Sequence, residues 1–341
     1  MQEKINVAIV GATGAVGEAM LQVLEERNFP VRQLYPLASA RSVGKTVQFR
    51  HQELDVLDCA TFDFSQVQIA LFSAGSEVSK HYAPIAAKAG CLVIDNTSCF
   101  RYDEDIPLVV PEVNPHCVAD FASRRIIANP NCSTIQMLVA LKPIYDAVGI
   151  EKIIVSTYQA VSGTGAKAIR ELITQVGELL NGRPTESKVY PYQIAFNVLP
   201  HIDVFLDNGY SKEEMKMLWE TRKILEDSDI QVNATTVRVP VLYGHSESIY
   251  IKTRHPITPE DARVLLEKAP GVVVVDDLAQ SLYPTPMTHA IGRDDVFVGR
   301  IRQDLEDACG LNLWVVADNV RKGAATNAVQ IAQLWLDTYF A

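Results

Sequence analysis

The N-terminal third of the chain alternates continuously apolar runs with segments of helical period, and this alternation restricts the possible folds more than any other feature. The first apolar run covers residues 7–10 and is followed by a helical pattern over 16–24. Further strands are expected over 67–74 and 92–94, with a helix over 76–88 between them. Strands that alternate with helices predict a parallel sheet covered on both faces, and runs that are apolar throughout suit strands buried on both sides.

The pattern changes after residue 132, where several strands follow one another and the helices stand apart. One helix is expected to begin at Ser211, a residue type that favours the N-cap position, and another at Thr258, just before Pro259. This succession predicts an α+β domain built on a large mixed, mostly antiparallel sheet. The expected helices cover 133–145, 167–180, 211–225 and 323–339, and the expected strands cover 152–158, 232–241, 246–254, 272–276, 296–302 and 311–317.

The length of 341 residues suggests two domains, at roughly 100–200 residues per domain. We expect the apolar helix over 323–339 to pack back on the first domain, which makes that domain discontinuous. The sequence therefore assigns residues 1–130 together with 320–341 to the first domain, and residues 131–319 to the second.

Charge balance and missing targeting signals limit the classes of protein to which the chain can belong. The sequence has 41 acidic and 31 basic residues, a net charge of -10, which argues against nucleic acid or an anionic membrane as a partner. No run approaches the roughly 18 apolar residues of a membrane helix, and the N-terminus lacks the pattern of a signal peptide. The 6 cysteines contain no CxxC pair, and cysteines and histidines show no ligand-like spacing. We therefore expect reduced thiols, a cytoplasmic location and no bound metal.

A glycine-rich turn, Gly11-Ala12-Thr13-Gly14-Ala15-Val16-Gly17, follows the first expected strand and opens the first helix. It is a G-x-x-G-x-x-G variant of the dinucleotide fingerprint, in which glycines let the backbone approach a pyrophosphate at the positive end of the helix. Glycines also occur in ordinary strand-to-helix turns. The strand before and the helix after favour a cofactor site over a purely structural turn.

The second strand should end near Leu37, where a site for NAD usually places an acid that holds the ribose 2′-hydroxyl. Residues 38–44 contain no acid, and instead offer Arg41 with Ser39 and Ser42, which suit a 2′-phosphate. We therefore predict NADP rather than NAD. The alternative is that Arg41 is a solvated loop side chain.

Cys132 is the candidate nucleophile. It follows Asn129-Pro130-Asn131 and lies at the N-terminus of the helix expected over 133–145. Free N–H groups and the helix dipole stabilise an anion there, so we expect the pKa of the thiol to be lowered. A thiolate in this place can attack a carbonyl, and the same N–H groups can receive the developing oxyanion. The alternative is a cysteine that only packs at the start of the helix.

A nucleophilic cysteine needs a partner that transfers protons, and the sequence has 7 histidines. His245 is favoured because it follows Gly244 at a strand junction, which suits a side chain that projects into a cleft. His201, which follows Pro200, stays open as the alternative.

Taken in order, these motifs resemble those of the aspartate-β-semialdehyde dehydrogenase family over essentially the whole chain. The resemblance implies a Rossmann-type parallel-sheet domain that binds NADP, an α+β catalytic and dimerisation domain, and a homodimer with no nucleic-acid or membrane partner. The matching pieces are Gly11 to Gly17, Asn129 to Thr134, Gln159 to Gly165, Glu213 to Lys216, Arg238 to Val241 with Gly244-His245, and Ala317 to Asn319.

The resemblance also implies a reaction, the reversible reductive dephosphorylation of L-aspartyl 4-phosphate to L-aspartate 4-semialdehyde. This step leads to diaminopimelate and lysine, threonine and methionine. By family likeness Cys132 forms an acyl thioester, which NADPH reduces. His245 is then the acid/base group, and Gln159 orients the covalent intermediate.

Substrate and cofactor contacts carry over by position. Arg238 matches the residue that binds the α-carboxylate of the substrate, and Glu213 matches the one that binds its ammonium. Arg101 and Lys216 match the residues that bind the phosphate. Without the resemblance, these charges would be interpreted as ordinary ion pairs. The implied cofactor contacts are Gly11, Thr13, Gly14, Ala15, Val16, Arg41, Ser42, Ser162, Gly163 and Asn319.

Three other functions are possible for such a fold, and each can be distinguished by a residue or a variant. A related reductase of N-acetylglutamyl phosphate does not need an acid for a free ammonium, so Glu213 discriminates against it. A short-chain reductase uses a Tyr-x-x-x-Lys pair, which none of the 12 tyrosines provides. A nucleotide sensor that has kept the fold would be unaffected by replacing Cys132 with alanine.

Overall fold

The computed structural model describes residues 3–340, so Met1, Gln2 and Ala341, which the sequence assigns to the first domain, lie outside the described part. The chain divides into two compact units. The first runs up to Asn131 and resumes at Ala324, and the second is Cys132–Gly323. The sequence places these two divisions after residues 130 and 319.

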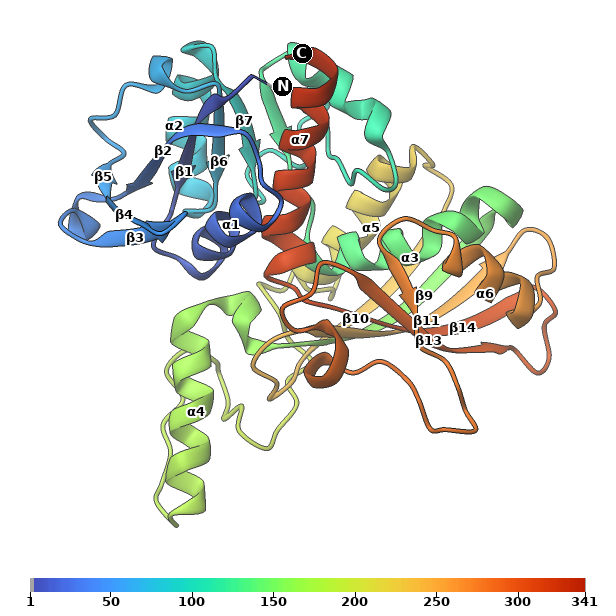
Figure 1. Ribbon diagram of the computed structural model, residues 1–341. Coiled ribbons are helices and arrows are strands. Elements are labelled where there is room, and N and C mark those ends of the chain that lie inside the picture. The colour runs from blue at the N-terminus through green and yellow to red at the C-terminus, as the bar shows by residue number, and fades with distance from the viewer. Residues whose placement is uncertain (1–2, 341) are drawn as a thin grey trace. The chain divides into compact units, whose positions relative to one another are not determined.

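A six-stranded parallel sheet forms the centre of the first unit (Figure 1). Its elements are β1 (Ile5–Val10), α1 (Ala15–Glu26), β2 (Val31–Ala38), β5 (Leu57–Asp58), β6 (Ile69–Phe72), α2 (Ser76–Lys88), β7 (Leu92–Asp95), β8 (Ile126–Ala128) and α7 (Asn327–Tyr339). The strands lie in the order β5-β2-β1-β6-β7-β8, and all neighbours pair in parallel. In Figure 1, α1 and α7 lie in front of the sheet and α2 behind it. The predicted parallel sheet is confirmed, and every residue of β1 is buried, as covering on both faces requires.

The first unit also contains a hairpin that the sequence pattern did not predict. Strands β3 (Thr46–Phe49) and β4 (Gln52–Asp55) pair antiparallel around Arg50 and His51, whose φ angles are 47° and 61°. Two positive φ angles in a two-residue loop are usually supplied by Asn-Gly or a similar pair. Here the loop is held from outside, because Arg50 N–H donates to Glu25 Oε2 and its guanidinium donates to the carbonyls of Val31 and Phe29.

Several expected elements differ in extent from those observed. The strand expected over 67–74 is shorter, Ile69–Phe72, because Val67 ends a 3-10 turn and the chain turns toward α2 after Phe72. The strand expected over 232–241 ends at Arg238, before Pro240, which has no N–H to continue a ladder. The helix expected over 323–339 begins as a π-helical turn, Arg321–Thr326, and becomes α-helical only in α7.

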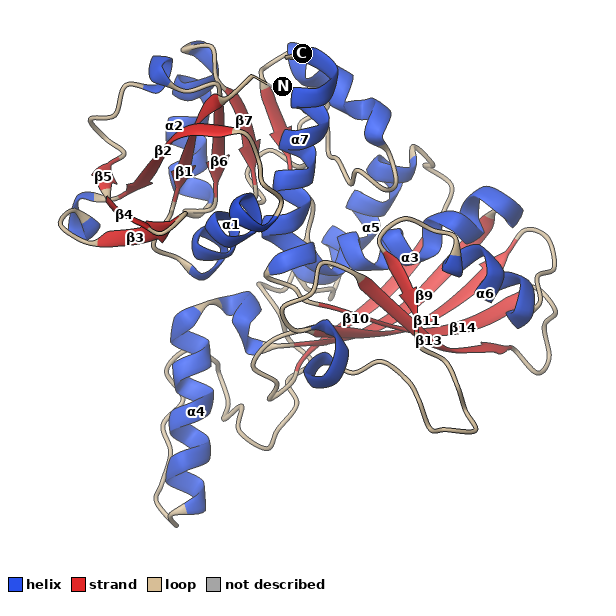
Figure 2. Ribbon diagram, viewed as in Figure 1, coloured by secondary structure: helices blue, strands red, loops and turns tan. Residues whose placement is uncertain are grey.

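A six-stranded mixed sheet forms the centre of the second unit (Figure 2). Its elements are α3 (Cys132–Val148), β9 (Ile150–Gln159), α4 (Ala166–Leu180), α5 (Lys212–Leu225), β10 (Gln231–Arg238), β11 (His245–Thr253), α6 (Pro259–Glu267), β12 (Val272–Val274), β13 (Val296–Gln303) and β14 (Gly310–Ala317). The strand order is β10-β9-β11-β14-β13-β12. The three central pairings are antiparallel and the two outer ones parallel, which confirms the predicted mixed, mostly antiparallel sheet.

Helices α3, α5 and α6 cover one face of this sheet, and the alternation along β9 shows the difference between the faces. Val155 and Thr157 point toward the helices and are buried, whereas Ile154 and Tyr158 point the other way and are 40% and 39% exposed. An antiparallel sheet with one solvated face normally carries polar residues on it. The apolar side chains of this open face are therefore unusual.

Helix α5 begins as the sequence predicted. Ser211 is its N-cap, with its Oγ accepting from Glu214 N–H, while the Glu214 carboxylate accepts from Ser211 N–H, a complete capping box. This start fixes the helical phase of α5 and so determines which of its charged side chains are buried. Glu213 and Lys216 are buried together with Glu220.

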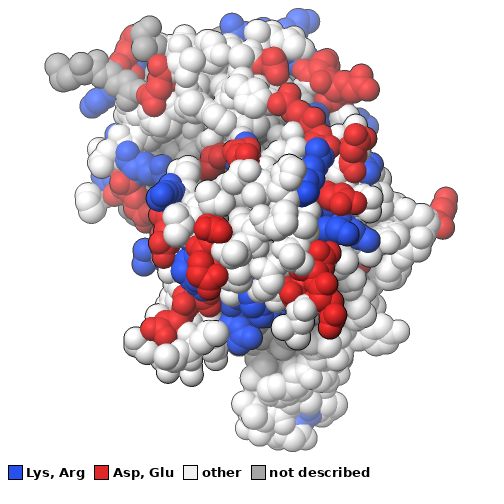
Figure 3. Space-filling view, turned by 90° about the vertical axis from the view of Figure 1, so that its right-hand side faces the viewer, with Lys and Arg blue, Asp and Glu red and all other residues white. Residues whose placement is uncertain are grey.

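Charged side chains of both signs are interspersed on the face shown in Figure 3, where neither sign forms an extended patch. Among the described residues, no helix is both long and apolar enough to cross a bilayer.

Candidate active site

The backbone of the glycine-rich turn in the first unit is closely packed, as is typical of a turn whose N–H groups bind a phosphate. Gly11 has a φ of 95°, and a Cβ there would lie 3.0 Å from Ala74 N. A Cβ on Gly17 would lie 2.2 Å from Gly11 O, so α1 can approach the turn only because this residue is glycine. Gly14 caps α1 without a side-chain hydrogen bond, which leaves the positive end of the helix available to an anion.

A cavity of about 570 Å³ opens from this turn. Thr13 and Gly14 lie at one part of its wall, and Arg41 and Ser42, from the turn after β2, at another. The sequence prediction missed one acid, Asp58, which lines the cavity from β5 and pairs with Ala38 at the end of β2. Its Oδ1 accepts from Ala60 N–H. The complete lining is Val10, Gly11, Thr13, Gly14, Ala38, Ser39, Ala40, Arg41, Ser42, Asp58, Cys59, Ala60, Ser73, Ala74, Val78 and Tyr82.

Cys132 is the first residue of α3, as the sequence predicted, and it is half-buried. The turn at Gly323 packs directly against it, since a Cβ on Gly323 would lie 2.6 Å from Cys132 Cβ and 3.1 Å from Cys132 Cα. The nucleophile candidate is thus fixed between the start of a helix and a glycine backbone.

Residues at the end of β9 form hydrogen bonds with several of the predicted site residues of the second unit. Gln159 Nε2 donates to Ser133 Oγ, beside Cys132, at 2.9 Å and to Glu213 Oε1 at 3.3 Å. The next residue, Ala160, donates its N–H to His245 Nδ1 at 3.1 Å and accepts from Arg238 Nη1 at 2.7 Å. Three predicted residues, Glu213, Arg238 and His245, therefore contact two consecutive residues, Gln159 and Ala160. We call this place the β9 corner.

His245 is fully buried, and its electrostatic surroundings favour the neutral ring. Burial and the Arg238 guanidinium lower its pKa to about 3, against the opposing effect of Glu213. Because Ala160 N–H occupies Nδ1, a neutral ring carries its hydrogen on Nε2. That Nε2 has no hydrogen-bond partner among residues 3–340, so it is available to a substrate oxygen.

Gly163 keeps the space between these two groups open. A Cβ at this position would lie 3.1 Å from Arg238 Nη1 and 3.4 Å from His245 Nε2. The Arg238 Nε is buried and also without a partner in the described part of the chain. A side chain at position 163 would therefore crowd both Arg238 and His245.

Asn319 holds the start of β11. Its Oδ1 accepts from Ser162 Oγ at 3.1 Å and from Gly244 N–H at 2.9 Å. Since a backbone N–H can only donate, this contact fixes the amide orientation and leaves Nδ2 as a donor. Asn319 thus positions Gly244 and, through it, His245.

Lys216 lies between two carboxylates, one of which the sequence analysis did not single out. Its Nζ is 2.9 Å from Glu213 Oε2 and 2.8 Å from Asp203 Oδ2. Burial opposes its charge, yet Glu213 and Asp203 together raise the pKa of Lys216 above its usual value. Asp203 lies in an irregular segment that contains several prolines. The sequence has no periodic pattern there that would place Asp203 next to α5.

The remaining predicted residues are divided between the two units. Arg101, Thr13, Ala15, Val16, Arg41 and Ser42 belong to the first unit, and Arg101 donates there to the Asn96 carbonyl at 3.0 Å. His201, the alternative to His245, stacks on Phe205 with ring centroids 4.2 Å apart. Of the two histidines, His245 is the one that contacts Ala160 at the β9 corner.

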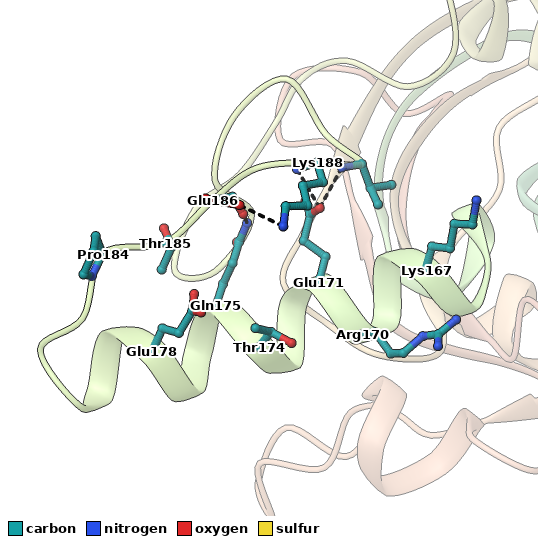
Figure 4. A pocket seen from close by; sticks show the side chains of 11 residues that line it. Lys167, Arg170, Glu171, Thr174, Gln175, Glu178, Pro184, Thr185, Glu186 and Lys188 are labelled. Carbon is teal, nitrogen blue, oxygen red and sulfur yellow. Dashed lines mark hydrogen bonds and ion pairs between the residues drawn. The ribbon is translucent and has the colours of Figure 1, made fainter.

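A further cavity, of about 520 Å³, lies between α4 and residues 184–189 (Figure 4). None of the predicted site residues lines it. The carboxylate of Glu171 accepts the N–H groups of Lys188 and Val189, and Gln175 accepts those of Ile194 and Ala195. The polar side chains of α4 thus hold the irregular segment that follows the helix, which is a structural task.

Comparison with known proteins identifies the family to which this arrangement belongs. The model of the semialdehyde dehydrogenase NAD-binding domain matches residues 6–121, and that of the semialdehyde dehydrogenase dimerisation domain matches residues 141–322. The chain is 70% identical to the aspartate-semialdehyde dehydrogenase of Legionella pneumophila over 334 residues, 98% of this chain and 96% of that protein. The chain belongs to the aspartate-semialdehyde dehydrogenase family. It is therefore an oxidoreductase with a pyridine-nucleotide-binding domain.

Solved structures of the family agree with this assignment. The aspartate semialdehyde dehydrogenase II of Vibrio cholerae, in a complex with ASA, has a TM-score of 0.97 at 60% identity and covers 99% of this chain and 100% of its own. The Candida albicans enzyme with NADP has a TM-score of 0.75 at 25% identity, and the match covers 98% of both chains.

Proposed function

We propose that this protein catalyses the NADP-dependent reductive dephosphorylation of L-aspartyl 4-phosphate to L-aspartate 4-semialdehyde through an acyl thioester on Cys132. The observation that carries the proposal is the β9 corner. There, the N–H and the carbonyl of Ala160 are bonded to His245 and Arg238. The Gln159 side chain is bonded to Glu213 and to Ser133, the neighbour of Cys132. An acyl-transfer site requires this combination of a nucleophile, a proton donor and charged groups that fix the substrate.

The first step forms the thioester. The Cys132 thiolate attacks the acyl carbon, a carbon–sulfur bond forms, and the carbon–oxygen bond to the phosphate breaks, so that phosphate leaves with the electron pair. The start of α3 favours the thiolate and offers N–H groups to the oxyanion of the tetrahedral intermediate. Gln159, which bonds to Ser133 beside the nucleophile, orients the acyl group.

In the second step, His245 stabilises the charge that develops on the carbonyl oxygen. Bound NADPH supplies the hydride that reduces the thioester carbonyl. The Nε2–H of neutral His245 donates a hydrogen bond to the carbonyl oxygen as negative charge develops on it. The oxyanion then re-forms the carbonyl as the carbon–sulfur bond breaks and the Cys132 thiolate leaves. The lowered pKa of His245, about 3, keeps the ring neutral, and the neutral ring holds the N–H that makes this hydrogen bond.

Two charged groups suit the amino-acid end of the substrate. Arg238 presents a buried guanidinium whose Nε is free among the described residues, and a planar fork is well suited to an α-carboxylate. Glu213 is buried at the β9 corner and is an appropriate partner for the α-ammonium. This acid favours aspartyl phosphate over N-acetylglutamyl phosphate, in which the nitrogen is neutral.

The cavity of the first unit fits a dinucleotide. The turn at Gly11 to Gly17 would hold the pyrophosphate, and Arg41 with Ser42 would hold a 2′-phosphate, which distinguishes NADP from NAD. In the second unit, Ser162 and Asn319 are the proposed cofactor contacts, and Asn319 offers its Nδ2 as a donor.

We further propose a homodimer in which two copies cover each other's open sheet face. The match to a dimerisation domain and the exposed Ile154 and Tyr158 support it.

The proposal is tested with fresh, reduced protein, aspartate semialdehyde, NADP and phosphate, by following the absorbance of the reduced nicotinamide. We expect reduction that requires phosphate, and none with N-acetylglutamate semialdehyde. Cys132→Ala should abolish turnover and still bind NADP, whereas a sensor protein would be unaffected. Absence of phosphate-dependent turnover in the unmodified protein contradicts the proposal.

A further inference from the structure

Lys216 is the residue expected to bind phosphate, yet both of its close partners are anions. The two carboxylates are held differently. Glu213 is buried, with 6% of its side chain exposed, and its second oxygen accepts from Gln159. The Asp203 side chain is 32% exposed. Among the described residues, its Oδ1 accepts from the N–H of the next residue, Val204, at 2.9 Å.

The backbone at Asp203 is also in a conformation that few residues adopt. Its φ is 68°, in the left-handed region, and it belongs to the irregular segment between Leu199 and α5. Leu199 is bonded in both directions to Arg238, and Val204 O accepts from Lys212 N–H at the start of α5. The segment is thus anchored at both ends, and Asp203 is held where its carboxylate reaches Lys216.

We propose that Asp203 occupies the anion-binding position of Lys216 when no substrate is bound, and that phosphate must displace it. This inference rests on the proposed function, in which Lys216 binds the phosphate. Asp203 is then a competing anion that sets the affinity for phosphate. It is a specificity-determining residue, since a ligand that displaces it needs more charge than a single carboxylate.

The chemistry favours this exchange. Phosphate brings more negative charge and more acceptor oxygens to an ammonium than a carboxylate does. The displaced Asp203 side chain is already partly solvated, so water replaces its lost partner at low cost. Glu213 stays in place and keeps Lys216 charged during the exchange. Before the substrate arrives, Asp203 holds the ammonium near the place where it will be used.

The test is Asp203→Asn, compared with Asp207→Asn. Asparagine tolerates the left-handed backbone and can still accept from Val204 N–H, so the variant keeps the loop conformation. Asp207 is an exposed acid of the same segment, and its replacement removes the same charge without touching Lys216. The KM for phosphate is measured in the oxidative direction, with aspartate semialdehyde and NADP saturating.

We expect Asp203→Asn to lower the KM for phosphate about two- to five-fold, the range of one partly exposed ion pair. Asp207→Asn should leave it unchanged. A gain of affinity separates competition from structural damage, which would weaken phosphate binding. An unchanged or increased KM, or an equal decrease in both variants, overturns the inference. If the unmodified enzyme shows no phosphate dependence, the proposed function itself fails.

Discussion

The position of the Cys132 sulfur depends on a neighbouring residue that has no side chain. A Cβ on Gly323 would overlap Cys132, at 2.6 Å from its Cβ, and real Cβ atoms do not approach so closely. The turn that carries Gly323 is fixed, because its N–H donates to the Asp318 carbonyl at 3.1 Å. A larger residue at 323 must therefore move either the turn or the nucleophile.

We predict that Gly323→Ala lowers kcat about 100-fold, because a displacement of roughly 1 Å at a reacting atom has an effect of that size. NADP binding, which involves the first unit, should change much less. The measurements are steady-state kinetics and the rate at which iodoacetamide alkylates Cys132. Gly177→Ala is the matched control, since Gly177 lies inside α4 with nothing within 4 Å of its added Cβ. A kcat of Gly323→Ala within two-fold of the unmodified enzyme would refute the prediction.

Glu247 is a buried acid in the same unit that the proposed mechanism does not use. It lies two residues after His245 on β11, between Thr157 of β9 and Val315 of β14, and is fully buried. Neither carboxyl oxygen has a hydrogen bond within the described chain. Burial raises its pKa well above the usual value, only partly opposed by Gln136 on α3. The folded state therefore holds this carboxyl in its protonated form.

A raised pKa has a definite consequence for stability. Below the pKa of the unfolded state, about 4.3, both states are protonated and Glu247 adds no pH dependence. Above it, the unfolded chain releases the proton while the folded chain retains it, so stability falls as the pH rises toward the folded pKa. Glu247→Gln cannot ionise and should be stabilised relative to the unmodified protein more at pH 8 than at pH 5. Thermal unfolding at the two pH values measures this, and parallel curves for the two proteins would show that Glu247 is ionised in the fold.

At the level of single residues, the sequence points to candidates that have a local motif around them. Cys132 follows a proline break before an apolar helical pattern, and His245 follows a glycine at a strand junction. Asp203 and Asp58 were missed for one common reason. Their roles depend on neighbours that only the tertiary fold brings close, Lys216 on α5 and Ala38 on β2.

At the level of elements, long segments with a periodic pattern were predictable. An element that is held by hydrogen bonds from distant parts of the chain was not. The strand in β1 and the helix in α5 carry their own signals, an apolar run in one and a capping box in the other. The β3–β4 hairpin has no such signal. Its turn uses Arg50 and His51 at positive φ and depends on bonds from Arg50 to α1 and to the chain before β2. Pattern analysis cannot detect a turn whose stabilising partners lie elsewhere.

The turn after β2 provides the test of cofactor choice. Arg41 lies in a 3-10 turn, Ala40–Ser42, that lines the dinucleotide cavity, and its side chain is exposed. We predict that Arg41→Ala raises the KM for NADP about ten-fold or more, since hydrogen bonds to a charged group are worth about 1.5–3 kcal/mol. The KM for NAD should stay the same, because NAD has no 2′-phosphate. Equal changes for both cofactors in steady-state assays would exclude a 2′-phosphate contact at Arg41.

At the level of the whole molecule, the exposed apolar side chains of the second unit indicate where a second copy would bind. Ile154 and Tyr158 lie on the open sheet face, and Tyr158 packs on Trp314 with ring centroids 5.5 Å apart. More than half of each of several side chains after α4 is also exposed. Exposed apolar side chains gathered in one unit support the proposed interface. The exposed residues of that segment are Tyr192, Phe196, Val198, Val204 and Phe205.

Ile154→Lys should therefore separate the dimer. A lysine at this position places an unpaired charge in the centre of the proposed interface, which costs about 2 kcal/mol or more and raises the dissociation constant at least about 30-fold. Val264→Lys is the control, because Val264 is 47% exposed on α6, which lies on the helix-covered side of the sheet. Sedimentation velocity over a range of concentrations distinguishes the mass of two chains from that of one. If Ile154→Lys remains a dimer at concentrations where the unmodified protein begins to dissociate, the two copies do not meet at this face.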